Sequence, residues 1–227
     1  MGYSYAPAVR VRSGAERATL VRRTYGLVFA SVIVTMLGVA FAFSQPALIQ
    51  AVAVHPFIAM ICVFAPLLMA QRSAHDFPRN IVFTGLFTFV EGIFLAPFLL
   101  MAEHAAPGSV SEAAMLTFAA FGALSLYATV SRRDFSAWGG FFMIGLVVLF
   151  VAILINAFVH SAAGGLVISS VGVLVMSGLL VFDTWRLLRS GSLGPDDYVL
   201  AAVSIYLDLI NLFIFILSLL SGGNRRR

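Results

Sequence analysis

The sequence has 227 residues, of which 61% are hydrophobic and only 11% are charged, and its mean hydropathy is +1.01. Because soluble domains carry about 25% charged residues, this composition excludes a soluble enzyme or a soluble binding module. The formal net charge is +4, and all 14 basic residues are arginines. They lie in short stretches between apolar runs, with no basic patch interleaved with aromatic residues that would indicate nucleic-acid binding.

The chain contains seven apolar runs long enough to cross a bilayer, which takes roughly 20 residues of helix. The second run is the least regular because Pro46, His55, Pro56 and Pro66 interrupt it, and its helix is expected to start as late as Pro56. No part of the chain is left over for a soluble domain. The sequence therefore predicts an all-α membrane protein with seven transmembrane helices at residues 24–43, 46–69, 81–101, 113–130, 137–159, 165–187 and 198–220.

Three segments are expected along the chain: a polar amino-terminal segment at residues 1–23, the seven-helix domain at residues 24–220 and a short basic tail at residues 221–227. The first segment has no apolar core followed by a small-residue cleavage site, so no removable signal peptide is expected. Arginines occur in this segment and in every second connection, which places that side in the cytoplasm by the positive-inside rule. The carboxyl terminus then lies outside, although its arginines run against the rule.

Three acidic residues, Glu91, Asp183 and Asp208, lie inside apolar runs. An aspartate at the bilayer centre costs about 2.5 to 3.5 kcal/mol, so such residues persist mainly where they face other helices and find partners. Each is explained either as a satisfied polar contact in the protein core or as a functional group. For Glu91 both interpretations stay open. The two aspartates favour function because consecutive helices carry them and a short loop joins these helices.

Spacing along the two helices brings Asp183 and Asp208 to comparable depths. Asp183 lies six residues before Arg189 and Asp208 lies eleven residues after Asp197, which corresponds to roughly 9 Å and 16 Å of helix. Helix tilt or local unwinding bridges a difference of this size. We therefore expect the two carboxyl groups to be in contact.

Two carboxylates about 4 Å apart, at an effective dielectric constant of about 20, repel each other by about 4 kcal/mol. The pair is therefore expected to share one proton and to act as a pH sensor. Loss of that proton leaves two buried negative charges, which are relieved when the helices separate, water enters or a cation arrives. Calcium prefers oxygen ligands, but the pair together with Asn211 and Thr184 falls short of the roughly six to eight oxygens of a tight site. Weak and transient calcium binding is expected, as in a conduction pathway.

Other chemistry finds little support in the sequence. Cys62 is the lone cysteine, and the four histidines lack the spacing of a metal site. No nucleotide-binding loop or nucleophile elbow is present. Intramembrane aspartyl proteases also carry two aspartates on adjacent helices, but those enzymes have a GxGD step where this chain reads IYLD. We therefore expect no enzymatic activity and no cofactor.

The segment SIYLDLINLFIFILSLL at residues 204–220 resembles the carboxyl-terminal signature of the Bax-inhibitor superfamily of membrane proteins. The stretches RRTYGLVFA, FVEGIFLAPFL, SRRDFSAWGGFF and SGLLVFDTWRLL agree with this, so the resemblance covers nearly the whole chain after Arg22. It implies a seven-helix fold whose last helix lies at the centre, wrapped by the other six. It also implies that Asp183 and Asp208 form a hydrogen-bonded pair whose protonation switches a calcium leak between closed and open states. In bacterial relatives an arginine at the cytoplasmic end of the second helix latches onto the first aspartate, and Arg72 in LLMAQRSAHD is the matching residue.

The residues and the resemblance together lead to one main hypothesis, a pH-sensitive, calcium-permeable leak channel in a bacterial plasma membrane. Protons and calcium are its expected ligands, with calcium as the permeant ion, and a monomer surrounded by lipid is expected. Two alternatives stay open. One is a stress-protective regulator that binds other membrane proteins, such as a membrane-bound protease, and the other is a proton-coupled cation exchanger.

Overall fold

The computed structural model describes residues 14–189, 192–194 and 196–223 of the chain, and every regular element within these residues is a helix. The amino-terminal arginine-rich segment is partly helical, because α1 begins at Gly14. Residues 1–13 and the arginines of the basic tail lie outside the described residues. The helices in chain order are α1 (Gly14–Phe43), α2 (Pro46–Val54), α3 (Pro56–Arg72), α4 (Arg79–Ala105), α5 (Ser109–Val130), α6 (Ser136–Val159), α7 (Ala162–Arg189) and α8 (Tyr198–Gly223).

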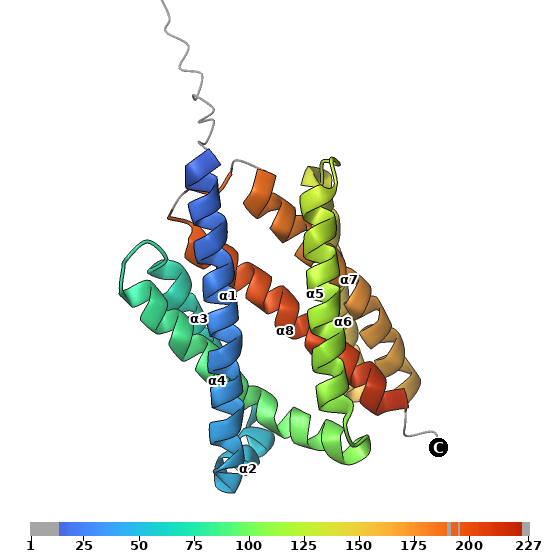
Figure 1. Ribbon diagram of the computed structural model, residues 1–227. Coiled ribbons are helices and arrows are strands. Elements are labelled where there is room, and N and C mark those ends of the chain that lie inside the picture. The colour runs from blue at the N-terminus through green and yellow to red at the C-terminus, as the bar shows by residue number, and fades with distance from the viewer. Residues whose placement is uncertain (1–13, 190–191, 195, 224–227) are drawn as a thin grey trace, which may run out of the picture.

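Six of these helices, α1 and α4 to α8, are long and apolar enough to cross a membrane. The spans predicted at these places are confirmed, and the chain is an all-helical membrane protein. In Figure 1, α1 begins at the top and α8 ends at the lower right, so the two ends of the described chain lie at opposite ends of the bundle. This arrangement agrees with seven crossings, six by these helices and one by the pair of α2 and α3.

The second predicted span is broken into α2 and α3, whose axes are bent by 100° at His55. Pro46 and Pro56 each stand at the start of a helix, where a missing N–H costs nothing. Pro56 cannot continue α2, because its ring clashes with the preceding turn. The short α2 lies against α1 and α4, while the 17 residues of α3 span about 25 Å. Together α2 and α3 make a seventh candidate span.

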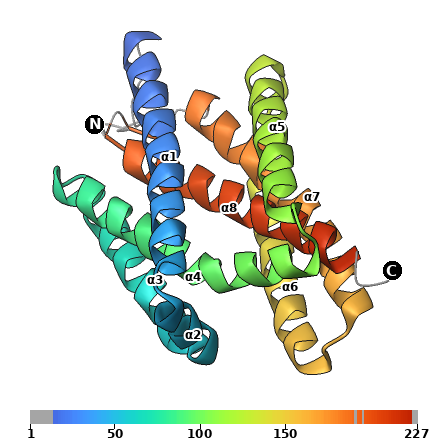
Figure 2. The same cartoon turned by 60° about the horizontal axis from the view of Figure 1, so that its bottom comes forward.

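Helix α8 is the most deeply buried of the candidate spans, as expected for a central carboxyl-terminal helix. It packs most extensively against α7 and also against α1, α4 and α5. Figures 1 and 2 show α8 running obliquely across α1 and α5, which stand more upright. The covering is uneven, because α6 packs mainly against α7 and is the least buried span.

Helices α1 and α4 cross in direct backbone contact at Gly38 and Gly92. A methyl group added to Gly38 would overlap the carbonyl oxygen of Phe89, and one added to Gly92 would overlap that of Thr35. Glycine is therefore required at both positions, as in small-residue contacts between membrane helices. This contact holds α1 and α4 together as one unit against α8.

Candidate functional site

Helices α7 and α8 are neighbours, and the two buried aspartates lie on the faces that meet. Asp183 is less than two turns from the end of α7, and Asp208 is near the middle of α8. Asp208 is only 7% exposed, and Asp183 is half-buried. Their side chains are within hydrogen-bonding reach of each other. The structure thus brings together the two residues that the sequence singles out.

A serine on α8 adds to this contact. Ser204 lies one turn before Asp208 on the same face of the helix, and its Oγ donates a hydrogen bond of 2.5 Å to Oδ2 of Asp183. Oδ2 of Asp208 is buried and has no hydrogen-bond partner among the described residues. Within the part of the chain that the structure describes, one hydroxyl donor therefore faces two carboxyl groups, and Oδ2 of Asp208 lacks a donor. A single proton between the two groups would supply the missing donor.

A small cavity leads to the pair from the end of the bundle where α7 ends and α8 begins. Its volume is about 150 Å³. Asp183 lines it whereas Asp208 does not, so Asp208 lies behind its partner. Arg186, one turn beyond Asp183, also lines the cavity and is close enough to act on Asp183 electrostatically. The other lining residues are Ser192, Leu193, Asp197, Leu200, Ala201 and Ser204.

Three other residues predicted for this site have no described hydrogen bond to the pair. Arg72 is exposed at the end of α3, and no hydrogen bond or ion pair joins it to Asp183 within the described residues. Nδ2 of Asn211 donates to the carbonyl oxygen of Leu207 on its own helix, at 2.8 Å. Thr184 is fully buried, and its hydroxyl oxygen has no partner in the part of the chain that the structure describes.

Glu91 faces a different side of α8. It lies partly buried on α4 and is close enough to Tyr206 to act on it electrostatically. The hydroxyl oxygen of Tyr206 is 2.6 Å from Oγ1 of Thr35, which itself donates to the carbonyl oxygen of Ser31. Tyr206 and Asp208 are two positions apart on α8, which turns them about 200° from each other around the helix axis. Glu91 therefore belongs to a separate polar contact between α1, α4 and α8.

Sequence reasoning missed three residues of the site. Ser204 precedes Asp208 by four positions, and Arg186 follows Asp183 by three. Both intervals place two side chains on one face of a helix, and this spacing is a signal that the sequence contains. Asp197, which lines the cavity, lies in the loop before α8 and gives no such signal.

The pair offers carboxylate oxygens, which are the ligands that calcium prefers, but too few of them for a stable site. Among the described residues, no group of three or more histidine, cysteine, aspartate or glutamate side chains could hold a metal ion. What the arrangement provides is two neighbouring carboxyl groups, and carboxyl oxygens are chemically able to bind either a proton or a cation.

The chain resembles proteins of viral, animal and bacterial origin along most of its length. It is 30% identical to the Golgi anti-apoptotic protein of Vaccinia virus (strain Lister), over 99% of this chain and 94% of the relative. It is 31% identical to protein lifeguard 4 of Mus musculus, over 99% of this chain and 93% of the relative. It is 36% identical to an uncharacterized membrane protein of Vibrio cholerae, over 77% of this chain and 79% of the relative.

A match at the level of the family agrees with these pairwise similarities. The sequence profile of the family described as "Inhibitor of apoptosis-promoting Bax1" matches residues 17–226. This range includes both aspartates and all the candidate spans except the first three residues of α1, so the membership predicted from the carboxyl-terminal motif is confirmed. The chain belongs to the Bax inhibitor family of membrane proteins.

Proposed function

We propose that this protein is a pH-sensitive, calcium-permeable leak channel in a bacterial plasma membrane, with its amino terminus in the cytoplasm. The observation that carries the proposal is the contact between the carboxyl groups of Asp183 and Asp208, buried between α7 and α8. The number of protons bound by this pair controls whether the channel is closed or open. The carboxyl oxygens of the pair bind the permeant calcium ion transiently.

Repulsion between the two carboxylates drives the switch. With one proton between them, the pair carries a single negative charge and holds α7 against α8. Without that proton, two charges about 4 Å apart repel each other by about 4 kcal/mol at an effective dielectric constant of about 20. Separation of the helices or arrival of a cation relieves this repulsion, so calcium flux rises as the pH rises.

Arg186 stabilises the closed state from the end of the bundle where α7 ends. Its guanidinium acts on Asp183 and lines the same cavity. One arginine matches the single negative charge of the pair, so an incoming calcium ion has to compete with it. The role that the resemblance gives to Arg72 therefore falls, in this proposal, to Arg186.

The proposed ion pathway runs along α7 and α8 and is closed in this structure. Two cavities lie along it, and the apolar side chain of Phe215 separates them. Toward the other end of the bundle lies a cavity of about 600 Å³. Between this cavity and Asp208, the ring of Phe215 packs so closely against Gly172 that a methyl group on this glycine would overlap it. Conduction along this interface requires Phe215 to move aside. The larger cavity is lined by polar residues that include Asn156, His160, Ser161, Ser169, Ser218 and Ser221.

Calcium flux into proteoliposomes tests the proposal. The wild type is compared with Asp183→Asn and Asp208→Asn in the same lipid, with a calcium indicator inside and the pH varied across the neutral range. Asp76→Asn is the matched control, because Asp76 is exposed in the turn between α3 and α4. We expect the wild type and the control to respond to pH and both pair variants to lose the response. Flux that ignores pH, or that survives loss of both aspartates unchanged, overturns the proposal.

A second comparison in the same assay tests whether Arg186 is the positive charge that stabilises the closed state. Arg186→Gln should shift the pH of half-maximal flux, because it removes the positive charge beside Asp183. Arg72→Gln should leave that pH unchanged, because Arg72 is exposed away from the described contacts of the pair. The reverse result would assign the latch to Arg72.

Proton-coupled cation exchange is a second candidate, since a proton and a cation that compete for one site also describe an antiporter. The proteoliposomes distinguish the two functions through a pH indicator in the lumen. An exchanger moves protons in step with calcium and is driven by an imposed pH gradient. A leak conducts calcium without this counter-flow.

The regulator hypothesis draws support from the name of the viral relative, which describes that protein as anti-apoptotic. For this chain it predicts a membrane-protein partner, such as a membrane-bound protease. Copurification from native membranes is the test. A stoichiometric partner, together with no ion flux from the purified protein, would replace the channel by the regulator.

A further inference from the structure

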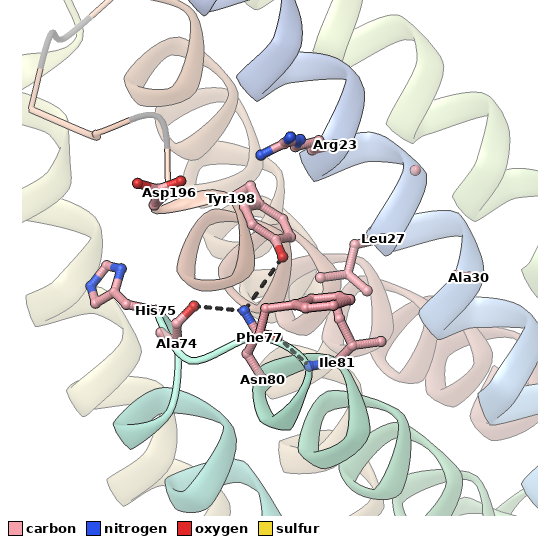
Figure 3. Close-up of a pocket in the computed structure, with 11 residues that line it drawn as sticks. Arg23, Leu27, Ala30, Ala74, His75, Phe77, Asn80, Ile81, Asp196 and Tyr198 are labelled. Atoms are coloured by element: carbon pink, nitrogen blue, oxygen red, sulfur yellow. Dashed lines mark hydrogen bonds between the residues drawn. The ribbon is translucent and has the colours of Figure 1, made fainter.

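Another cavity opens at the same end of the bundle as the aspartate cavity, and the proposed ion pathway does not use it. Its volume is about 560 Å³, and it lies between α1, the turn from α3 to α4 and the start of α8. Figure 3 shows its polar side chains converging from these three elements. They are Arg23, His75, Asn80, Asp196 and Tyr198.

Asn80 builds the wall of this cavity. It is only 1% exposed. Its Nδ2 donates to the carbonyl oxygen of Ala74 at 2.9 Å and to the hydroxyl of Tyr198 at 3.4 Å, and its Oδ1 accepts from the N–H of Ile81. These bonds, drawn in Figure 3, hold the turn against α8. Because the hydroxyl of Tyr198 accepts from Asn80, its own proton remains available to a ligand.

Arg23 and Asp196 bring two opposite charges to this cavity that do not pair with each other. The guanidinium carbon of Arg23 lies 5.7 Å from the ring centre of Tyr198, and within the described residues this side chain has no hydrogen bond or ion pair. The carboxylate of Asp196 is exposed and also has no partner there. Figure 3 shows Arg23 and Asp196 on either side of Tyr198. Both charges are therefore open to a ligand.

Apolar side chains continue the cavity toward the lipid. Phe77 is 79% exposed although it is large and apolar, and Ile81 is exposed beside it. Leu27 and Ala30 of α1 complete the apolar side. Arginine and tyrosine commonly lie at the interface between lipid and water, with apolar side chains deeper in the bilayer. A ligand that fits both parts has a polar head with two opposite charges and an apolar tail.

We infer that this cavity binds the headgroup of a zwitterionic aminophospholipid. The phosphate accepts charge-assisted hydrogen bonds from Arg23 and a hydrogen bond from the hydroxyl of Tyr198. The ammonium group donates to Asp196, and an acyl chain lies along Phe77 and Ile81. An anionic phospholipid without an amine offers the same phosphate to Arg23 and Tyr198 but brings no positive charge to Asp196. The proposed site is therefore expected to bind an aminophospholipid more tightly than an anionic phospholipid without an amine.

Native mass spectrometry of the purified full-length protein tests the inference, with phosphatidylethanolamine and phosphatidylglycerol of identical acyl chains as probes. We expect about tenfold stronger retention of phosphatidylethanolamine, because one charge-assisted hydrogen bond separates the two lipids. Arg23→Gln should weaken retention of both lipids, whereas Asp196→Asn should abolish only the preference. Arg22→Gln and Asp76→Asn are the matched controls, because both side chains are exposed near this end and do not line the cavity.

Three results would overturn the inference: equal retention of the two lipids, equal retention by Arg23→Gln and Arg22→Gln, or displacement of the lipid by inorganic phosphate at similar concentration. The last result would mean that the site takes a free anion. Thermal unfolding in detergent controls for folding. If Arg23→Gln unfolds early, Tyr198→Phe replaces it and should lower retention of both lipids, and unchanged retention would also count against the site. None of these readouts depends on ion flux.

Discussion

Replacement of Asp208 by asparagine gives the sharpest test of the shared proton. The two side chains have nearly the same size, so asparagine fits the buried position. Its amide donates a hydrogen bond toward Asp183 and so imitates the protonated carboxyl group, whose Oδ2 has no partner among the described residues. The variant therefore keeps the closed contact at every pH and cannot develop the second negative charge.

The size of the effect follows from the charge that Asp208→Asn removes. Two carboxylates about 4 Å apart, at an effective dielectric constant of about 20, repel by about 4 kcal/mol. Since about 1.4 kcal/mol is a factor of ten in an equilibrium constant, the closed-to-open ratio of the variant at high pH should exceed that of the wild type by roughly a thousandfold. The flux should accordingly remain at its low-pH level.

The assay is calcium flux into proteoliposomes across the neutral pH range, with thermal unfolding in detergent as the control for folding. The wild type should show flux that rises with pH, and Asp208→Asn should show flux that is low and flat. A folded variant whose flux rises with pH as the wild type does would refute the reasoning, because the pair would then not be the sensor.

Three further substitutions probe contacts between the helices. Ser204→Ala removes the hydrogen bond to Asp183 and should lower the free energy of unfolding by about 1 to 2 kcal/mol in a thermal unfolding assay; an unchanged midpoint would show that this bond contributes little. Gly38→Ala forces α1 and α4 apart and should cost about 1 to 3 kcal/mol, whereas Gly26→Ala, with open space around it, should not; equal losses would contradict the backbone contact. Phe215→Ala removes the side chain between the two cavities and should raise calcium flux at every pH; wild-type flux in the folded variant would place the pathway elsewhere.

Features that depend on the residues of a single helix, such as the position of a span, could be predicted from the sequence. The apolar runs gave the spans of α1 and of α4 to α8, and Pro46 and Pro56 marked the second span as irregular. The 100° bend at His55 could not be predicted, because a proline either kinks a helix or ends it, depending on what packs around it. Here α2 finds a place against α1 and α4.

Features that depend on two helices could be predicted only where the chain connects them closely. Asp183 and Asp208 were paired because a short loop joins their helices, despite a difference of depth along the helix axes. Figure 1 shows α8 running obliquely across the bundle, and a tilted helix advances less along the bundle for each residue than an upright one. The tilt is set by packing against α1, α5 and α7, and no local pattern in the sequence encodes it.

The side of α8 that Glu91 faces is a feature of the same kind. The sequence left its role open, and in the structure it acts on Tyr206, on the side of α8 away from Asp208. The rotation of α4 about its axis decides this, and the backbone contact at Gly38 and Gly92 sets that rotation. Single-sequence periodicity does not reveal which glycines meet across two helices.

Gly38 and Gly92 join α1 to α4 through main-chain atoms that neither gain nor lose a proton. A change of pH therefore leaves the contact between α1 and α4 unchanged, whereas in the proposed mechanism the contact between α7 and α8 loosens when a single proton is lost. In this mechanism α1 and α4 form the rigid part of the bundle, and α7 is the part that moves. Helix α6 packs mainly against α7 and therefore moves with it. Because this movement displaces lipid beside α6, the fluidity of the bilayer should set the speed of opening while pH sets its extent.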